Sequence, residues 1–335
     1  MSSAGFTFRD GERIISFGPG VLAAAPAELA RAGFDRYALL TTERTLADTP
    51  AAVETGAATV LLVPRGPVPD AAAAVRDGVQ GRPIVALGGG RVVDAAKAIA
   101  AADGGRVAAI PTTLAGSSFT PFHRMPAGVE GYGLTRPAVA LCDPAAMASA
   151  PMPGLAATAM NALAHATEAL YAPGANPVSE GAALRAAGLF ARGFAGDPPA
   201  RADLALAAVL AGWAVGTAGL AVHHALCQTI VRATGTPHAE TNAVMLPHSV
   251  AFMAGRASEA IAALAAALGR AGAEDAAPGV ATLAALAGPR RLADLGVEPE
   301  ELEAIVAATL EHPGVAMTPG NVSRADLEAL VTAAL

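Results

Sequence analysis

The sequence predicts two domains, an α/β domain with a mostly parallel, doubly wound sheet over residues 1–150 and an all-helical domain over residues 151–335. Short β-rich runs alternate with Ala-rich helical stretches up to about residue 145, as expected for such a sheet. Segments of helical length dominate from Pro151 onward. The residues Asp143–Pro153 read as the linker, which places a ligand cleft between the two halves.

The expected elements follow from periodicity and from the Gly and Pro residues that separate them. Strands are predicted over Arg13–Phe17, Tyr37–Thr41, Ala58–Val63, Pro83–Leu87, Val107–Ile110 and Ala138–Cys142. Helices are predicted over Val21–Ala32, Arg91–Ala102, Thr158–Tyr171, Val178–Phe194, Arg201–Val222 and Ser258–Leu268. Residues 119–135 interrupt the alternation and predict an irregular loop or hairpin.

Composition excludes several functional classes. A hydrophobic content of 53% with 15% charged residues excludes disorder, and a net charge of −7 argues against nucleic acid and anionic membranes as partners. No apolar run reaches transmembrane length without a charge, Gly or Pro, and Met1–Gly5 lacks the start of a signal peptide. Cys142 and Cys227 fit neither a disulfide framework nor a zinc site. We therefore expect a cytoplasmic protein that acts on a small molecule.

A glycine stretch is the first candidate for ligand binding. Gly88, Gly89 and Gly90 come directly after a predicted buried strand and before a predicted helix, where backbone can approach a pyrophosphate. The pattern is not GxGxxG, and by itself it also fits a plain turn. Asp94 and Lys97, the only lysine of the chain, follow on one face of the helix. We predict that the three glycines, Asp94 and Lys97 bind the cofactor, with Lys97 facing a phosphate.

Hydroxyl side chains at the carboxyl ends of predicted strands are further cofactor candidates, because α/β sheets bind ligands at that edge. They are Thr41, Thr42, Thr112, Thr113 and Ser117. The alternative is Ser/Thr-rich turns that bond only to their own backbone. Glu43 favours the 2′-hydroxyl of NAD and Arg44 the 2′-phosphate of NADP, so both cofactors stay open, with a slight preference for NADH.

Histidines cluster in the second half of the chain. Asn161 and His165 lie four residues apart on a predicted helix and share a face. His223 and His224 are adjacent, and His238 follows after a short interval. A lone histidine is usually structural, but this grouping predicts a site.

Motifs spread over nearly the whole chain carry a family resemblance. They are Gly88–Lys97, Pro111–Ser117, Met160–Pro173, His223–Cys227, Pro237–Thr241 and Leu246–His248. Together they resemble the group III, or iron-containing, alcohol dehydrogenases, and most of all the maleylacetate reductase branch. The resemblance implies a Rossmann-like N-terminal domain, a helical C-terminal domain as in the dehydroquinate synthase-like fold, bound NAD or NADP, and a homodimer.

Asn161 is the first departure from the metal-dependent relatives. The resemblance aligns Asn161, His165, His224 and His238 with their metal site, where the first position is an aspartate. An amide is a poorer ligand for a hard divalent ion, although three histidines could still hold zinc. Maleylacetate reductases also lack the aspartate and are regarded as metal-independent. We therefore predict no metal, with the three histidines as its ligands if one binds.

Gln228 is the second departure, because relatives place a histidine near the nicotinamide at this position. Glutamine donates a hydrogen bond but no proton near neutral pH. The following residues 229–235 lack the family's glycine pair, and Met317–Val322 replaces an Asn-Pro-Arg-Pro-like segment. The change leaves three alternatives open: a metal-dependent alcohol dehydrogenase or aldehyde reductase, a lyase or cyclase like the related 3-dehydroquinate synthase, and a repurposed, non-redox member.

The resemblance implies an NAD(P)H-dependent, metal-independent reductase of maleylacetate or a similar unsaturated oxo acid. Hydride would add at the carbon β to the ketone, and hydrogen-bond donors would have to stabilise the resulting enolate. The imidazoles of His165, His224 and His238 are the catalytic candidates, beside Asn161 and Gln228. Substrate carboxylates would bind Arg124 and Arg232, with His123 lining the cleft, although both arginines equally suit surface positions. His248 and His312 are expected to be structural.

Overall fold

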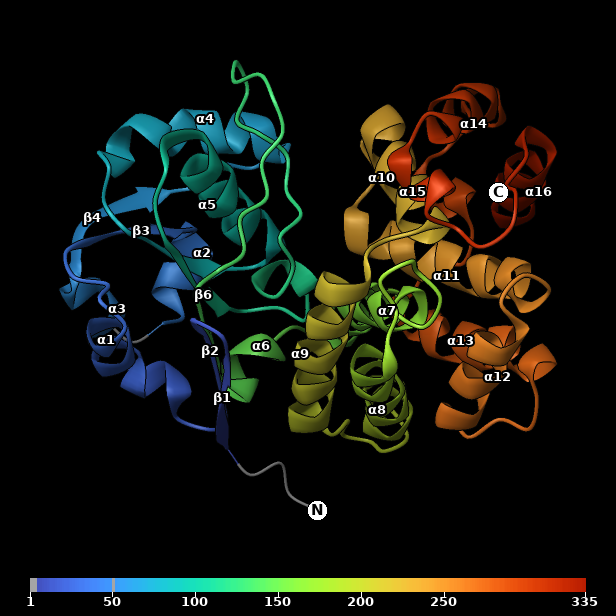
Figure 1. Cartoon of the computed structure of the whole chain (residues 1–335), viewed down its shortest axis with the longest axis horizontal. Coiled ribbons are helices and arrows are strands. Elements are labelled where there is room, and N and C mark those ends of the chain that lie inside the picture. The colour runs from blue at the N-terminus through green and yellow to red at the C-terminus, as the bar shows by residue number, and fades with distance from the viewer. Residues whose placement is uncertain (1–4, 50–51) are drawn as a thin grey trace. The chain divides into compact units, whose positions relative to one another are not determined.

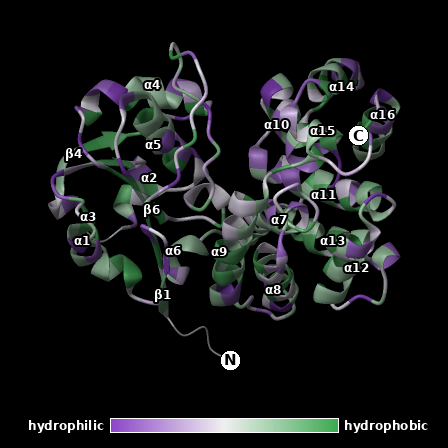
Figure 2. Cartoon of the chain, viewed as in Figure 1, coloured by the Kyte–Doolittle hydropathy of each residue, from purple (hydrophilic) through white to green (hydrophobic). Residues whose placement is uncertain are grey.

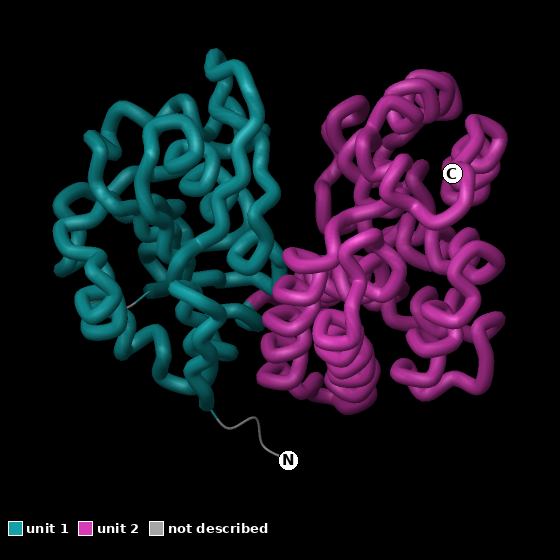
Figure 3. Tube along the Cα trace, viewed as in Figure 1, with its two compact units in different colours: residues 1–149 teal, residues 150–335 magenta. Residues whose placement is uncertain are grey.

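The computed structural model describes residues 5–49 and 52–335, and it divides into two compact units, residues 1–149 and 150–335 (Figure 3). Residues 1–4, which bear most of the signal-peptide prediction, lie outside the described residues. Figure 1 labels most of the elements of both units. The predicted fold class is confirmed, with an α/β N-terminal unit and a helical C-terminal unit.

A seven-stranded sheet forms the N-terminal unit, in the order β1-β2-β7-β6-β5-β3-β4. All neighbouring strands run parallel except β1, which pairs antiparallel with β2. The strands are β1 Phe6–Asp10, β2 Arg13–Phe17, β3 Tyr37–Thr41, β4 Ala57–Leu62, β5 Ile84–Gly88, β6 Val107–Pro111 and β7 Val139–Cys142. The helices are α1 Val21–Arg31, α2 Glu43–Ala47, α3 Ala52–Thr55, α4 Val68–Val79, α5 Gly90–Asp103 and α6 Pro144–Met147.

Both faces of this sheet are covered by helices, which is why its central strands are continuously apolar. Ala38 and Leu40 of β3 pack in one core cluster with residues of α4 and α5. Leu39 points to the opposite face and packs with α1 and α3. Figure 2 shows the hydrophobic colour along the strands. The carboxyl ends of β3, β5 and β6 therefore lie along one edge of the sheet, where this class of sheet binds ligands.

Strand β1 was not predicted. Phe6, Thr7 and Phe8 alternate apolar and polar side chains, and Gly11 turns the chain at a φ of 62°. An Asp-Gly pair between two such runs is a hairpin signal, so the sequence contained the information. The predicted irregular loop is present: among the described residues, 119–138 contain no helix or strand after the 3₁₀ turn Gly116–Ser118.

The described residues of the C-terminal unit form helices joined by loops and contain no strand. Its helices are α7 Met152–Glu168, α8 Pro177–Gly193, α9 Arg201–Ala218, α10 Val222–Thr234, α11 His238–Ala254, α12 Ser258–Ala267, α13 Ala276–Ala284, α14 Leu302–Leu310, α15 Pro313–Ala316 and α16 Arg324–Ala334. The helix predicted over Arg201–Val222 ends earlier, because Gly219 adopts a φ of 99° that separates α9 from α10. Of the described helices, α9 alone has the length and apolarity of a membrane span, yet most of it is buried.

Candidate active site

A pocket of about 560 Å³ opens in the N-terminal unit at the carboxyl ends of β3, β4 and β5. The predicted residues Thr42, Gly89, Gly90 and Thr113 contribute to its lining. The other lining residues are Glu43, Arg44, Thr45, Leu62, Val63, Pro64, Arg65, Arg91 and Val92. The lining is therefore a glycine loop, a helix start and several charged side chains, which is suited to an extended phosphate-containing ligand.

The three glycines are required by close packing around this pocket. A Cβ on Gly88 would lie 2.8 Å from Cγ2 of Val92, and one on Gly89 would lie 3.1 Å from Cγ2 of Thr113. A Cβ on Gly90 would lie 3.1 Å from Oγ of Ser117. No side chain caps the first turn of α5, and the backbone N–H groups of Val92 and Val93 donate to the carbonyl of Gly89, so the N–H groups of Gly90 and Arg91 are the ones that face an anion. This cradle fits the pyrophosphate of a dinucleotide.

Two predicted hydroxyls lie buried beside the same strand ends without a hydrogen-bond partner. They are Oγ1 of Thr41, the last residue of β3, and Oγ1 of Thr112, whose backbone N–H donates to the carbonyl of Gly88 at 3.0 Å. Buried polar atoms are normally satisfied, so two unsatisfied hydroxyls at one sheet edge are consistent with a missing polar ligand.

Lys97 has a different environment from the one expected. Its ammonium is fully buried and donates to Oδ1 of Asp94 at 2.7 Å, to the carbonyl of Ser117 at 3.1 Å and to the carbonyl of Phe122 at 2.6 Å. Ser117 in turn donates from Oγ to Oδ2 of Asp94 at 3.0 Å. All three N–H groups of Lys97 are thus used inside the protein. A structural role, tying the loop after β6 to α5, replaces the expected phosphate contact.

The predicted substrate residues of the N-terminal unit lie on that loop. His123 is partly buried, and Nδ1 lies 3.3 Å from the carbonyl of Arg124, while Nε2 is buried without a hydrogen-bond partner. Burial lowers the pKa of His123. The Arg124 side chain is exposed.

Helices α7, α10 and α11 bring the polar residues of the C-terminal unit together. Asn161, His165 and Glu168 occupy one face of α7, at spacings of four and three residues, and all three are buried. The histidines of α10 stand against this face: the rings of His165 and His224 stack with centroids 4.5 Å apart, and those of His223 and His224 meet edge-on at 5.1 Å. Oδ1 of Asn161 is buried and has no hydrogen-bond partner.

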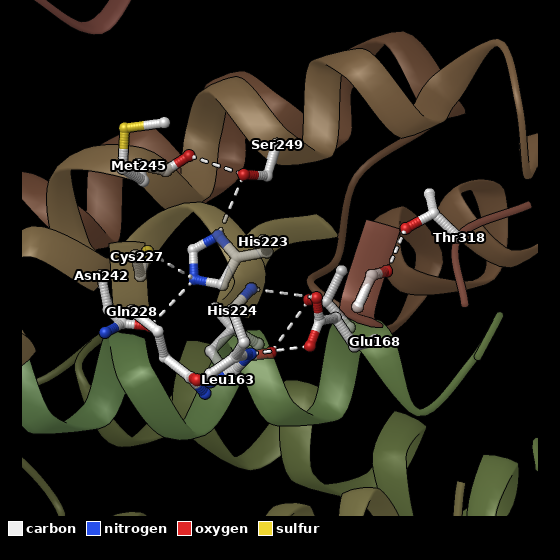
Figure 4. Close-up of polar contacts among 12 residues, drawn as sticks. Leu163, Glu168, His223, His224, Cys227, Gln228, Asn242, Met245, Ser249 and Thr318 are labelled. Atoms are coloured by element: carbon white, nitrogen blue, oxygen red, sulfur yellow. Dashed lines mark hydrogen bonds and ion pairs between the residues drawn. The ribbon is translucent and has the colours of Figure 1, made fainter. Parts of the chain in front are cut away.

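Glu168, which the sequence reasoning missed, anchors this cluster (Figure 4). Its carboxylate accepts from the backbone N–H of His224 at 3.2 Å and lies 2.6 Å from Nδ1 of the same residue. Burial raises the pKa of Glu168, while backbone N–H groups at the start of α10 lower it. Those donors and the helix dipole favour the carboxylate, so the shared proton resides on Nδ1 of His224.

The tautomer of His224 follows from this contact. With its proton on Nδ1, the ring presents the lone pair of Nε2, which is buried and has no hydrogen-bond partner. Burial, together with the nearby His238 and His312, lowers the pKa of His224 to about 3. His224 is thus a neutral hydrogen-bond acceptor in this site, not the donor that the sequence reasoning assumed.

A second chain of hydrogen bonds orients His238. Asn242 donates from Nδ2 to the carbonyl of His238 at 2.7 Å, and Nδ2 lies 3.3 Å from Nε2 of the His238 ring. Oδ1 of Asn242 accepts from Nε2 of His223 at 3.0 Å, and Nδ1 of His223 lies 2.9 Å from Oγ of Ser249 (Figure 4). Burial lowers the pKa of His223 to about 3, so that ring is neutral. Nε2 of His238 is the acceptor for Asn242, which leaves the ring proton of His238 on Nδ1.

Gln228 lies one turn beyond His224 on α10 and contacts a histidine that was expected to be structural only. Nε2 of His312 is 3.2 Å from Oε1 of Gln228. The two residues are 84 positions apart in sequence, and no local pattern predicts their contact. Arg232 follows Gln228 by one further turn of α10. The pKa of His312 is lowered mainly by burial and, to a smaller extent, by the positive charge of Arg232. Five of the seven histidines therefore gather around α10.

This arrangement does not fit a metal ion well. The rings of His165 and His224 stack nearly parallel, with an interplanar angle of 7°. The nitrogen lone pairs lie in the planes of these rings, so they do not point toward one common position. Nε2 of His238 is occupied by Asn242. Over residues 5–49 and 52–335, no group of three or more His, Cys, Asp or Glu side chains is arranged to hold a metal.

Comparisons with known proteins agree with this fold. Residues 16–151 match the family model "Iron-containing alcohol dehydrogenase", and residues 155–335 match "Fe-containing alcohol dehydrogenase family, C-terminal". The chain belongs to the iron-containing alcohol dehydrogenase family. It is an oxidoreductase, and the predicted resemblance to the maleylacetate reductases is confirmed.

The relatives include several named maleylacetate reductases. Maleylacetate reductase 1 of Rhodococcus opacus is 39% identical over 75% of this chain and 72% of its own length. Maleylacetate reductase 2 of Cupriavidus pinatubonensis is 37% identical over 77% of each chain. The crystal structure of maleylacetate reductase from Rhizobium sp. strain MTP-10005 superposes with a TM-score of 0.84 at 29% identity, covering 99% of this chain and 98% of that one.

Proposed function

We propose that this member of the family is an NAD(P)H-dependent reductase of maleylacetate or a similar unsaturated oxo acid, and that it works without a metal. The observation that carries the proposal is the histidine cluster around Glu168, whose rings are oriented by hydrogen bonds and do not converge on one ion. Asn161 stands where a metal-dependent relative has a carboxylate, which supports the same reading. The named maleylacetate reductases among the relatives give the substrate class.

The N-terminal unit would hold the dinucleotide in its glycine pocket, with Gly89 and Gly90 against the pyrophosphate and Thr42 at the ribose end. NAD(P)H, when bound, supplies the hydride. Glu43 and Arg44 both line the pocket, and Arg65 and Arg91 add two cations. This excess of guanidinium groups supports use of NADPH beside NADH.

In the C-terminal unit the imidazoles divide the proton chemistry between them. His238 keeps its proton on Nδ1 and would donate a hydrogen bond to the oxygen of the enolate formed when hydride adds to the double bond, while water would supply the proton that the enolate carbon takes up. His224 offers a lone pair at Nε2 and would accept from a hydroxyl or water. Both rings are held by buried partners, so their geometry is set before substrate binds.

The test is consumption of NADH and NADPH by the purified enzyme with maleylacetate, with the product analysed by mass and NMR. We expect a product that carries two additional hydrogens at the former double bond and retains its ketone. Turnover that reduces the ketone to an alcohol would favour an alcohol dehydrogenase, and turnover without net cofactor change would favour a lyase or cyclase. Cofactor binding without any turnover of oxo acids would mark a repurposed member.

A metal-dependent alcohol dehydrogenase is the second candidate, and one observation favours it. A carboxylate on Nδ1 of a histidine, as in the Glu168–His224 pair, also orients histidines that bind metals through Nε2. Metal analysis of the purified enzyme separates the two candidates. The predicted homodimer stays a prediction that sedimentation analysis tests.

A further inference from the structure

Gln228 and His312 form a pair whose hydrogen-bond polarity is fixed by the backbone. His312 precedes α15, and its Nδ1 accepts from the backbone N–H of Gly314 at 3.1 Å. A backbone N–H can only donate, so Nδ1 carries a lone pair. Burial and the charge of Arg232 lower the pKa of His312, which keeps the ring neutral with its proton on Nε2.

The orientation of the Gln228 amide follows directly. Nε2–H of His312 donates to Oε1 of Gln228 at 3.2 Å, so the carbonyl side of the amide is used by the protein. The amide NH₂ group is on the other side of the side-chain terminus and faces away from His312. Gln228 is only partly buried, so this donor is accessible to a ligand.

Three functional groups then follow one another along α10. His224, Gln228 and Arg232 are spaced by four residues each, which places them on one stripe of the helix, about 6 Å apart along its axis. The stripe carries an acceptor at the buried Nε2 of His224, a neutral donor at Gln228 and a cation at the exposed Arg232. A carboxylate held by the donor and the cation, with the rest of the molecule extending toward His224, matches this order of groups.

We propose that Gln228, oriented by His312, donates a hydrogen bond to a substrate carboxylate, and that Arg232 supplies the charge of this carboxylate subsite. The proposal rests on the proposed function, since it assigns one carboxylate of an oxo acid to a place on α10. It gives Gln228 a binding role where the relatives' histidine suggested proton transfer. His312 is a positioning residue, because it acts through Gln228.

The experiment uses maleate, a dicarboxylate without a ketone, titrated calorimetrically into the full-length protein saturated with oxidised cofactor. Gln228→Glu keeps an oxygen for His312 but replaces the NH₂ donor by a negative oxygen. The variant loses one hydrogen bond to the maleate carboxylate and adds repulsion between two negative charges. We therefore expect maleate to bind about 10- to 100-fold more weakly. Gln80→Glu is the matched control, because Gln80 is an exposed residue of the N-terminal unit, and we expect unchanged binding.

His312→Asn is the second variant and isolates the positioning role. Asparagine can still cap α15 but is too short to reach Gln228, so the amide becomes free to rotate. We expect a several-fold rise in KM for maleylacetate with little change in kcat, because the lost interaction acts on binding. A merely structural role for His312 would instead lower thermal stability and leave KM unchanged, which contradicts the proposal.

Wild-type maleate affinity in Gln228→Glu, an unchanged KM for maleylacetate in His312→Asn, or no maleate binding to the wild type overturns the inference. The proposed function fails separately, through absence of maleylacetate turnover by the wild type. Maleate binding that depends on Gln228 in an enzyme without such turnover would therefore keep the subsite and reject the reaction.

Discussion

Replacing Glu168 by glutamine tests how protons are distributed in the histidine cluster. Glutamine matches the volume of the fully buried Glu168, and its amide oxygen can still accept the backbone N–H of His224. Its NH₂ group would then face Nδ1 of His224, where the ring now donates. The ring would have to move its proton to Nε2, so the acceptor in the site would become a donor.

The expected magnitudes separate activity from stability. Glu168→Gln keeps the number of hydrogen bonds but removes the negative charge that strengthens them. We expect this loss to lower the free energy of unfolding by about 1 kcal/mol. An imidazole held in the wrong tautomer costs a general acid–base site far more, about 10²- to 10⁴-fold in kcat. We therefore expect a variant that is folded, with a melting temperature lowered by only a few degrees, and nearly inactive.

The assay is steady-state NAD(P)H oxidation with maleylacetate, measured beside thermal melting. Glu303→Gln is the matched control, because that carboxylate is exposed and pairs with Arg324 at the surface. If the shared proton were on Glu168, glutamine would imitate the neutral acid and activity would persist. Near wild-type kcat in Glu168→Gln would therefore refute the assigned tautomer of His224.

Three further predictions concern the cofactor pocket and pH. Gly90→Val places a side chain against Ser117 and into the pocket. We expect the affinity for the dinucleotide, measured by fluorescence titration, to fall by at least about 10-fold. Unchanged affinity would contradict binding of the pyrophosphate at the glycine stretch. Arg44→Ala should raise KM for NADPH more than for NADH, and equal effects would argue against a 2′-phosphate contact. Burial holds the pKa of His223 and His224 at about 3, below that of the unfolded chain near 6.5, so the unfolded state binds more protons between these values. Chemical denaturation should therefore show a free energy of unfolding that decreases as the pH is lowered from about 6.5 toward about 3, by up to about 1.4 kcal/mol per pH unit for each ring.

The fold was predictable because its signals are local. Strand and helix periods alternate in the first half, and the central strands are short and apolar. The glycine stretch could be placed at a strand end for the same reason. Lys97 shows where prediction from local spacing ends. Its distance from Asp94 in the sequence indicates that both lie on one helix face, but only the tertiary structure shows that Lys97 also donates to the carbonyl of Phe122.

The candidate site was only partly predictable because it is assembled from distant segments. Glu168 could have been found, since it continues the helix face of Asn161 and His165 by one more turn. His312 could not, because its contact with Gln228 joins α10 to the turn before α15 and depends on how these helices pack. The roles of the rings as donors or acceptors needed their hydrogen-bond partners, which no residue spacing specifies.

The central claim, a metal-independent reductase, is tested most directly by turnover of metal-free enzyme. The protein would be treated with a strong chelator, its residual metal content measured by mass spectrometry, and NAD(P)H oxidation with maleylacetate followed before and after addition of Fe²⁺ or Zn²⁺. We expect the metal-free enzyme to be fully active and added metal to leave kcat unchanged. Activity that disappears with the metal and returns in proportion to the ion bound would contradict the account.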